Sequence, residues 1–395
     1  MKSIRIYCKN DGMYHDVPKG ATLEEVYETL ELNLPCCVTS CKVNNRVEGL
    51  HYTINDSRDL EYLTLASPSG LRTYTRSLFF VLYKAVRDLY PEAELRIGTP
   101  VSGGYFCRLA LPGGITPEVP ERLRRRMAEI VASDLPFRRV TAHTTDAIEV
   151  FRRQGFTRKV LLLESIGDLY THYYTLGETV DYFYSALLLR TGQLTVFDLV
   201  PFGEGLLLRV PDPEHPDRLR PMTEQHQMFA VFQEQHRRQE ILGCTTVGEL
   251  NTLIRAGHTN DLVNVAEALQ EKQIAQIADH IASHDALRVV LIAGPSSSGK
   301  TTFSKRLSVQ LMACGKKPVS ISLDNYFVDR ERTPLDETGD YDFEHIEALN
   351  LPLFNDQMNR LLVGEEVELP RYDFPTGMSV PSGRRLRLQP DTISP

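Results

Sequence analysis

The chain has 395 residues and a formal net charge of −8, with 42% hydrophobic and 24% charged residues. This length exceeds what one ordinary core organises, so we expect two to four domains. The acidic balance argues against a general nucleic-acid coat, and no apolar run reaches the roughly 20 residues that span a bilayer. With no signal-peptide pattern and too few cysteines for a disulfide scaffold, we expect a cytoplasmic protein with reduced thiols and no membrane partner.

The first 65 residues predict a small α+β unit. Apolar and polar residues alternate at the very start, and Asp11-Gly12 is a hairpin turn signal. Thr22 is a suitable N-cap for a helix with one apolar face. The expected elements are strands over residues 3–8, 14–17, 38–43 and 60–64 and a helix over residues 22–30.

This region resembles a known module. IRIYCKNDGMYHDVPKGATLEEVYETL, followed by CKVNNRVEGLHYTINDSRDLEYLT, is similar to a TGS domain, the β-grasp module found on threonyl-tRNA synthetase and on some GTPases. The resemblance covers residues 1–65. It implies a binding or regulatory domain that carries no chemistry of its own.

After Ser67-Pro68-Ser69-Gly70, which we interpret as a linker, apolar spacing predicts a helix over residues 73–90. The stretch AELRIGTPVSGGYFCRLALPGG and its continuation to residue 155 resemble the second additional domain of threonyl- and alanyl-tRNA synthetases. The resemblance covers residues 70–210. It implies an α+β domain that, in those enzymes, hydrolyses mischarged tRNA with an HxxxH pair and a later Cys/His pair.

This sequence departs from both catalytic pairs. The first pair falls at Arg76 and Phe80, and the second falls at Phe183 and Leu187. Phenylalanine and leucine cannot ligate a metal or transfer a proton, so we expect editing chemistry to be absent. The spacing of the remaining histidines rebuilds no site, and we expect them to be satisfied or solvent-facing: His143, His172, His226 and His236. The two N-terminal domains are then expected to bind a small effector or tRNA.

Residues 211–221, rich in proline and charge, predict a domain boundary. Two helical patterns follow, over residues 222–239 and 262–283. We interpret residues 222–285 as a helical connector that packs onto the next domain. A dimerising coiled coil is the weaker interpretation, because the pattern spans too few heptads.

The stretch LRVVLIAGPSSSGKTTFSKRL, residues 287–307, contains the spacing GxxxxGKT. Backbone N–H groups of such a loop at a helix N-terminus can wrap a polyphosphate, the lysine ammonium can reach its outer oxygens, and the threonine hydroxyl can ligate Mg²⁺. The flanks predict a buried parallel strand over residues 289–292 and a helix over residues 302–312 that ends at Gly315. The expected phosphate-binding residues are Gly294, Ser296, Ser297, Ser298, Gly299, Lys300, Thr301 and Thr302.

A second strand, predicted over residues 318–323, would deliver Asp324 at its carboxyl end, the edge where doubly wound sheets collect ligands. There its carboxylate can accept a proton from an attacking hydroxyl or help to hold Mg²⁺. The plainer alternative is an aspartate that only caps a turn.

Four motifs in order, AGPSSSGKTTFSKRL, SLDNYF, GDYDFEHIEAL and ELPRYDFPTG, look like the uridine kinase and phosphoribulokinase family, most nearly its nucleoside kinases. The resemblance implies a P-loop domain with a mostly parallel sheet over residues 286–395, and transfer of the ATP γ-phosphate to the 5′-hydroxyl of a nucleoside. It makes Asp324 and Lys300 catalytic residues and Thr301 with Asp324 the Mg²⁺ ligands. It places Phe343 and Glu344 near the sugar.

By the same resemblance Tyr372 and Phe374 build the base pocket, although these aromatic residues could equally be ordinary core. The pyrimidine kinases carry a histidine where this chain has Gly377 and a tyrosine where it has Phe327, so the sequence does not specify the nucleoside. The family also continues into an acidic strand and an arginine-bearing lid that this sequence lacks. We therefore interpret the chain as truncated at its C-terminus and expect slow turnover.

An alternative function remains open at this point. The N-terminal half could recognise tRNA or an effector while the phosphate loop serves as a nucleotide sensor without catalysis. The sequence makes no prediction of oligomeric state.

Overall fold

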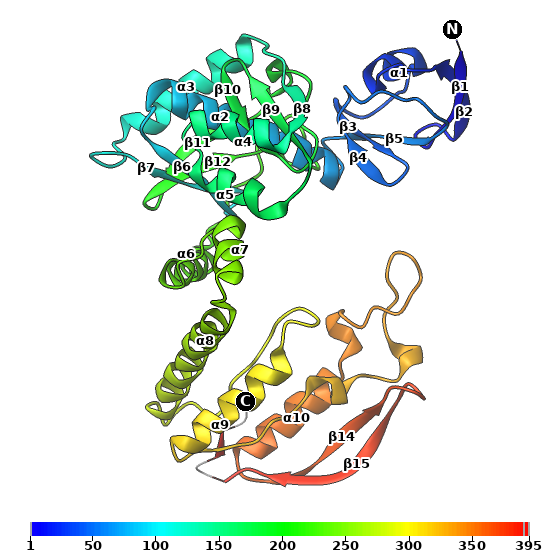
Figure 1. Cartoon of the computed structure of the whole chain (residues 1–395). Helices are drawn as coiled ribbons and strands as arrows, with labels where there is room; N and C mark the ends of the chain where they lie inside the picture. The colour runs from blue at the N-terminus through cyan, green and yellow to red at the C-terminus, as the bar shows by residue number, and fades with distance from the viewer. Residues whose placement is uncertain (1, 390–391, 394–395) are drawn as a thin grey trace. The chain divides into compact units, whose positions relative to one another are not determined.

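The computed structural model describes residues 2–389 and 392–393, and it divides into two compact units, Met1–Thr259 and Asn260–Pro395 (Figure 1). The multidomain mixture of α+β and α/β elements expected from the sequence is present. Within the described residues, no helix is both long and apolar enough to cross a membrane.

The first unit begins with a five-stranded sheet in the order β2-β1-β5-β3-β4. Strands β1 and β5 pair in parallel, and the other neighbours are antiparallel. Helix α1 buries Leu23 and Val26 against this sheet. The elements are β1 (Ser3–Cys8), β2 (Met13–Pro18), α1 (Leu23–Leu30), β3 (Val38–Val43), β4 (Arg46–Glu48) and β5 (Asp59–Thr64). The strands and helix expected in residues 1–65 are confirmed, whereas the three-residue β4 was too short for its pattern to be noticed.

The cap of α1 is also confirmed. The Thr22 hydroxyl accepts from the Glu25 amide at 3.2 Å, and the Glu25 carboxylate accepts from the Thr22 amide at 2.8 Å. This capping box satisfies two N–H groups that a helix start leaves unpaired.

The predicted linker at Ser67-Pro68-Ser69-Gly70 is wrong. Ser67 caps α2 (Pro68–Leu89) by accepting from the Gly70 amide at 3.1 Å, and Pro68 is the first helical residue. Serine before a helix and proline at its first position are stabilising there, so the same residues that suggested a linker start a helix. A Cβ on Gly70 would lie 2.0 Å from the Thr64 carbonyl oxygen, which shows how tightly this helix start packs on β5.

Helix α2 is the centre of the main core of this unit. Its residues Leu78, Phe80, Val81, Leu82 and Ala85 are fully buried. Around it lie the antiparallel sheets β11-β12-β7-β6 and β10-β9-β8 and the helices α3, α4 and α5. The bounds are β6 (Glu94–Val101), β7 (Gly104–Ala110), α3 (Glu118–Ala132), β8 (Arg138–His143), α4 (Thr144–Arg153), α5 (Thr157–Ile166), β9 (Tyr170–Leu176), β10 (Thr179–Asp181), β11 (Asp198–Phe202) and β12 (Gly205–Arg209).

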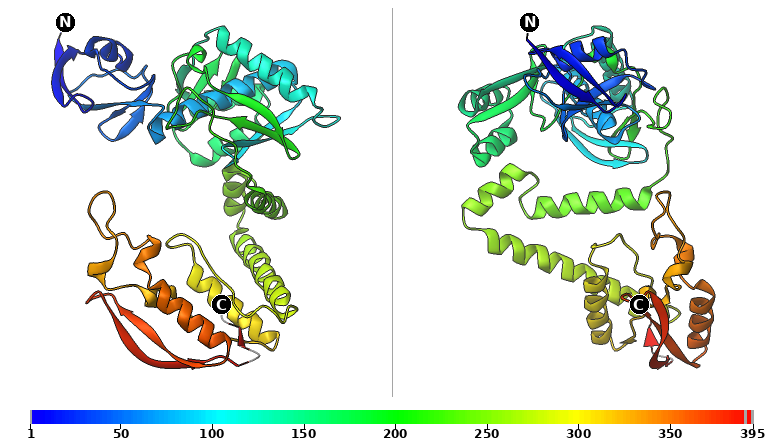
Figure 2. Two further views of the ribbon diagram at one scale, coloured as in Figure 1. Left: turned by 180° about the vertical axis from the view of Figure 1, so that it is seen from behind. Right: turned by 90° about the vertical axis from the view of Figure 1, so that its right-hand side faces the viewer.

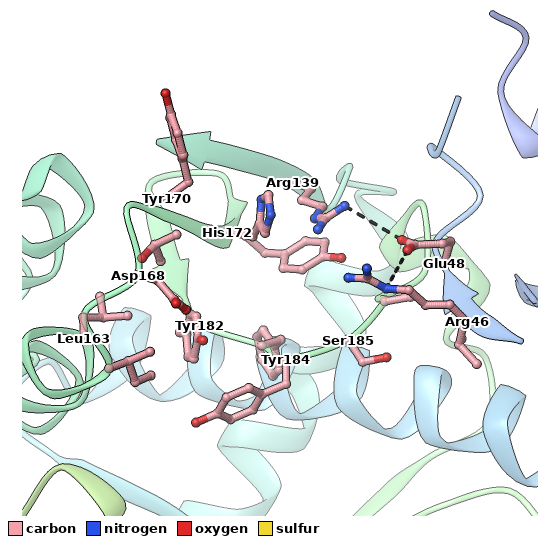
Figure 3. Close-up of a pocket in the computed structure, with 16 residues that line it drawn as sticks. Arg46, Glu48, Arg139, Leu163, Asp168, Tyr170, His172, Tyr182, Tyr184 and Ser185 are labelled. Carbon is pink, nitrogen blue, oxygen red and sulfur yellow. Dashed lines mark ion pairs between the residues drawn. The ribbon is translucent and has the colours of Figure 1, made fainter. Parts of the chain in front are cut away.

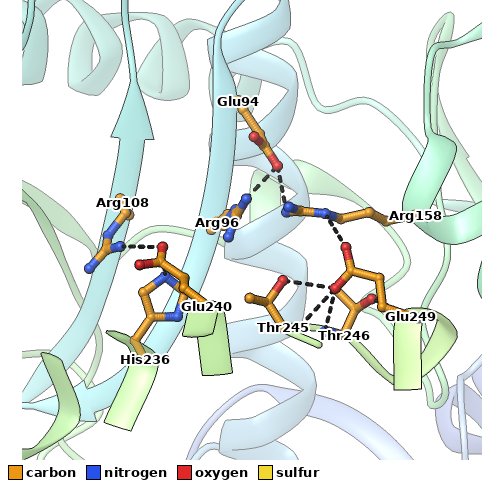
Figure 4. Close-up of polar contacts among 9 residues, drawn as sticks. All are labelled: Glu94, Arg96, Arg108, Arg158, His236, Glu240, Thr245, Thr246 and Glu249. Atoms are coloured by element: carbon orange, nitrogen blue, oxygen red, sulfur yellow. Dashed lines mark hydrogen bonds and ion pairs between the residues drawn. The ribbon is translucent and has the colours of Figure 1, made fainter. Parts of the chain in front are cut away.

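Helices α6 (His226–Ile241) and α7 (Val247–Arg255) belong to the first unit. Arg158 of α5 bridges Glu94 of β6 at 2.7 Å and Glu249 of α7 at 3.3 Å, and Arg108 of β7 faces Glu240 of α6 at 3.7 Å (Figure 4). The prediction that the whole connector packs onto the last domain is therefore wrong for these two helices. Their contacts with α5, β6 and β7 could not be seen in the sequence pattern.

Helix α8 (Thr259–Ala282) lies in the second unit apart from its first residue, as predicted for this part of the connector. Its Ile274, Ala278 and Ile281 pack against Leu307 and Leu311 of α9 (Lys300–Ala313). Helix α9 confirms the predicted helix, and Gly315 follows it with φ +77°. Such a left-handed residue ends a helix and favours glycine.

The rest of the second unit contains α10 (Leu351–Leu362), which lies along the antiparallel hairpin of β14 (Glu366–Asp373) and β15 (Met378–Arg387) (Figure 2). The short strands β13 (Lys317–Pro318) and β16 (Thr392–Ile393) pair in parallel. A mostly parallel sheet is not formed by the described residues.

The predicted strands over residues 289–292 and 318–323 are wrong. The structure has only an isolated bridge at Val289 in the first segment, and in the second only Pro318 belongs to a strand, β13. Val290 and Ile292 pack on the core between α8 and α9, while Leu291 between them is 78% exposed. Val319 and Ile321 likewise pack beside α10 and β14. The apolar pattern therefore comes from packing on one side of an extended segment, and a parallel strand would need pairing and burial on both faces.

Candidate functional site

The phosphate loop lies at the start of α9. Gly299 is the N-cap residue with φ +87°, and no side chain caps the helix. The first-turn N–H groups of Lys300, Thr301 and Thr302 therefore have no intrahelical acceptor and no side-chain cap. Ser297 is also left-handed at φ +60°, an uncommon conformation for a residue with a side chain. These amides, together with the positive end of the helix dipole, form a cradle suited to a polyphosphate.

Lys300 is folded back over this loop. Its ammonium donates to the carbonyl oxygens of Gly294 at 2.7 Å and Pro295 at 3.1 Å. A Cβ at Gly294 would lie 2.7 Å from the Ser298 hydroxyl oxygen, so a larger residue there would require this hydroxyl to rotate away. The loop residues from Gly294 to Thr302 are all exposed, so the predicted cradle is open to a ligand.

Asp324 lies in the short 3₁₀ helix η2 (Leu323–Tyr326), three residues before Phe327. Its carboxylate is exposed and has no hydrogen-bond or ion-pair partner among the described residues. It does not cap a turn with its side chain, in contrast to Asp336, whose carboxylate accepts from the Thr338 amide and hydroxyl. A free carboxylate at this position is available for a proton or a cation.

Mg²⁺ prefers oxygen ligands and commonly uses only one or two protein side chains together with phosphate oxygens and water. The exposed Thr301 hydroxyl and the unpartnered Asp324 carboxylate are ligands of this kind. Within the described residues there is no group of three or more His, Cys, Asp or Glu side chains that would hold a metal without such help.

The predicted substrate-binding aromatic residues meet in one cluster around Phe327. The Phe327 ring centroid lies 5.5 Å from Phe343, 5.4 Å from Tyr372 and 6.4 Å from Phe374. Tyr372 and Phe374 are themselves 5.0 Å apart at an interplanar angle of 82°. Phe343 and Phe374 are 36% and 56% exposed, so the cluster presents part of these two rings to solvent.

The sequence motifs indicate Phe327 only as a difference from the pyrimidine kinases, and the structure places it at the centre of the cluster. The signal that could have revealed this role is its position three residues after Asp324 in SLDNYF. Glu344 follows Phe343 and is exposed, with no side-chain partner among the described residues.

Tyr372 carries a buried polar group at this cluster. The residue is 4% exposed, and its hydroxyl is buried without a hydrogen-bond partner in the described structure. An unpaired buried hydroxyl costs free energy, which a ligand with a matching donor or acceptor would recover.

Arg330 occupies the space beside Gly377. The Arg330 amide donates to the Gly377 carbonyl at 2.8 Å, and its guanidinium donates to the Phe374 carbonyl. A Cβ on Gly377 would lie 2.9 Å from Arg330 side-chain atoms, and Gly377 is left-handed at φ +72°. The turn that carries Phe374 therefore has no room for the histidine expected of a pyrimidine kinase.

In the first unit, the positions that departed from the editing motifs also lie together in a core. Phe80 and Phe183 pack with ring centroids 5.4 Å apart, and Phe80 and Leu187 are fully buried. Arg76 is largely buried and its Nε has no hydrogen-bond partner in the described structure. Hydrophobic packing thus occupies the place where a hydrolytic site would need polar groups.

The remaining histidines have ordinary surroundings, as predicted. His143 stacks on Tyr170, His172 bonds the Thr141 hydroxyl at 2.8 Å, and His236 faces Glu240 at 3.2 Å. His226 is exposed beside Glu224.

Two regions of the chain are similar to different groups of known proteins. Residues 289–395 match the model of the Phosphoribulokinase / Uridine kinase family, so the C-terminal region carries a domain of this kinase family. Among solved structures, a possible uridine kinase from Bacillus stearothermophilus is 26% identical and covers 31% of this chain and 68% of its own, with a TM-score of 0.27.

The N-terminal region is homologous to threonine–tRNA ligases. The relative from Symbiobacterium thermophilum is 29% identical over 201 residues, which is 51% of this chain and 31% of the ligase. The relative from Desulforamulus reducens is 31% identical over 165 residues, 42% of this chain and 26% of the ligase. The chain thus spans between a quarter and a third of the length of these curated relatives.

Proposed function

We propose that the protein transfers the γ-phosphate of ATP to the 5′-hydroxyl of a nucleoside, with N-terminal domains that regulate this activity. The observation that carries the proposal is the aromatic cluster of Phe327, Phe343, Tyr372 and Phe374, which begins three residues after Asp324. The exposed rings of Phe343 and Phe374 can stack on a flat base. The buried Tyr372 hydroxyl, which has no hydrogen-bond partner among the described residues, can bond a polar atom of that base. The domain family adds the expectation of a phosphate donor.

The residues divide the chemistry between them. First-turn amides of α9 hold the β- and γ-phosphates. The Lys300 ammonium gives up its hydrogen bonds to the carbonyl oxygens of Gly294 and Pro295 and donates to phosphate oxygens instead. Asp324 accepts the proton of the nucleoside 5′-hydroxyl. The 5′-oxygen then forms a bond to the γ-phosphorus of ATP as the bond to ADP breaks, and ADP leaves. Thr301 and Asp324 are the residues that would hold Mg²⁺, which neutralises phosphate charge when bound. Glu344 and Phe343 are assigned to the sugar.

The departures at Phe327 and Gly377 bear on the choice of nucleoside. Both remove a hydrogen-bonding side chain that pyrimidine kinases possess, and Arg330 fills the space at Gly377. We therefore propose a nucleoside recognised by stacking and by Tyr372, without a commitment to uridine or cytidine.

The test is a panel of the common ribo- and deoxyribonucleosides incubated with labelled ATP and Mg²⁺. Phosphorylation of at least one nucleoside is expected, and Asp324→Asn should lower kcat by about 10²–10⁴-fold, the usual contribution of a general base. Because Asp324 is exposed and unpartnered, this change should leave the melting temperature unaltered. Asp356→Asn, at an exposed ion pair with Arg360 on α10, is the matched control.

If no nucleoside is phosphorylated and ATP still binds, the catalytic proposal fails. Tight binding of tRNA in the same preparation would then favour the second candidate, a binding protein that senses nucleotides. The homology of the N-terminal region to threonine–tRNA ligases is the observation behind that candidate.

A further inference from the structure

A hollow of about 150 Å³ lies in the first unit, apart from every residue assigned to phosphate transfer (Figure 3). Four segments line it: the β4 strand with Arg46 and Glu48, the β8–β9 pair with Arg139 and His172, the segment from Tyr182 to Ala186, and the end of α5 with the turn after it, which contribute Leu163, Ile166 and Asp168. Of the four positions that depart from the editing motifs, Phe183 lies in its wall, and Arg76, Phe80 and Leu187 do not.

At the β4 end of the hollow two guanidinium groups face one carboxylate, and the second carboxylate of the lining, Asp168, lies on the opposite side (Figure 3). Arg46 Nε lies 3.0 Å from Glu48 Oε1, and Arg139 Nη1 lies 3.9 Å from Glu48 Oε2. Two guanidinium groups thus share a single carboxylate, which is only 12% exposed on its side chain. The Arg139 contact is longer than a hydrogen bond, so this guanidinium keeps donors for another oxyanion.

His172 lies beside Arg139 in the hollow (Figure 3). Its Nδ1 bonds the Thr141 hydroxyl at 2.8 Å, and its Nε2 has no partner among the described residues. Burial, followed by the charges of Arg139 and Arg46, lowers the pKa of His172. The charges of Arg139 and Arg46 create a positive potential at the His172 ring, and a positive potential attracts anions.

The rest of the wall mixes aromatic, apolar and polar side chains. Tyr184 is 75% exposed and meets Tyr182 at an interplanar angle of 73°, whereas Tyr170 is 52% exposed and stacks on His143. A cavity of about 150 Å³ is the size that holds benzene in an engineered protein core, so a compact ligand of roughly a dozen non-hydrogen atoms or fewer fits this open hollow.

We propose that this hollow binds a small molecule with a flat ring and one oxyanion, either a carboxylate or a phosphate. Arg139 and Arg46 bind the oxyanion, His172 Nε2 donates to it, and the exposed ring of Tyr184 contacts the flat part. This site is independent of the proposed phosphate transfer, and it gives the N-terminal unit a small-molecule ligand in place of the hydrolysis that its packed core excludes.

The experiment uses benzoate and phenyl phosphate as probes, titrated into the full chain by calorimetry and by NMR of the histidine side chains. We expect at least one probe to bind with Kd below 1 mM and to raise the pKa of His172, because a bound anion favours the protonated ring. The probe that binds tells whether a carboxylate or a phosphate is preferred.

Arg139→Gln should weaken the binding of that probe by at least tenfold. Arg138→Gln is the matched control, since Arg138 is the preceding residue of β8, is exposed and does not line the hollow. Tyr184→Ala removes an exposed ring without touching the ion pairs, so its weaker binding would not reflect misfolding. The proposal is overturned if neither probe binds at 10 mM, or if Arg139→Gln and Tyr184→Ala both bind as the unchanged chain does.

Discussion

Two buried tyrosines of the second unit should respond in opposite ways to loss of their hydroxyl groups. Tyr372 is 4% exposed and its hydroxyl has no partner in the described structure, whereas Tyr326 is 1% exposed and donates to Gln357 Oε1 at 2.8 Å. An unsatisfied buried polar group costs about 1–3 kcal/mol, and removal of one partner from a buried hydrogen bond costs a similar amount. Tyr372→Phe should therefore raise the free energy of unfolding by about 1 kcal/mol or more. Tyr326→Phe should lower it by about 1–3 kcal/mol, because the Gln357 oxygen is left unpaired.

Although Tyr372→Phe should stabilise the fold, it should weaken the binding of the nucleoside. If the Tyr372 hydroxyl bonds the base, loss of that bond should weaken the free energy of nucleoside binding by about 0.5–1.5 kcal/mol. This loss corresponds to a rise in KM of roughly two- to twelvefold. Urea unfolding followed by circular dichroism gives the first quantity, and steady-state kinetics gives the second. The reasoning is refuted if Tyr372→Phe destabilises the fold as Tyr326→Phe does, or if it leaves KM unchanged for every nucleoside that is phosphorylated.

Three further predictions concern positions whose surroundings the structure defines closely. Gly248→Ala should lower the free energy of unfolding of the first unit by about 1–3 kcal/mol, because the added Cβ would lie 2.7 Å from a backbone nitrogen of α5. Urea unfolding measures this loss. The neighbouring Val247→Ala, at an exposed position, is the control and should change the free energy of unfolding little. Burial and then the charge of Arg139 lower the pKa of His51, so its contribution to stability is complete above the unfolded pKa of about 6.5 and is lost as the pH falls towards the folded value. Unfolding free energy should fall by at most about 1.4 kcal/mol per pH unit from this group, and His51→Phe should flatten the pH dependence between pH 7 and 5. Gly377→Ala should cost about 1–2 kcal/mol for its left-handed backbone and should raise KM for the nucleoside, since it displaces the turn that carries Phe374; an unchanged melting temperature would contradict this.

Local signals in the sequence were sufficient for much of this molecule. The capping box of α1, the alternation in β1 and the glycine after α9 each depend on residues only a few positions apart, and each was predicted. The predicted phosphate loop rests on the same kind of local signal, because its glycine, lysine and threonine lie within a few residues of one another, and its binding role stays a prediction. The motifs predict Asp324 as a catalytic residue and Phe343, Tyr372 and Phe374 as substrate-binding residues; these roles stay predictions, and the structure joins the three rings in one cluster around Phe327.

The tertiary structure decided what depends on distant neighbours. The apolar run 289–292 reads as a strand, yet whether it pairs is settled by the segments beside it, and only packing places Leu291 in solvent. Helices α6 and α7 join the first unit through Arg108 and Arg158, whose partners are far away in the chain. The central position of Phe327, the unpaired hydroxyl of Tyr372 and the hollow at Arg139 arise in the same way. Hydrogen bonds within a turn join residues that are neighbours in the sequence, so the sequence predicts them. Burial and charge balance depend on residues that are distant in the sequence and meet only in the folded chain.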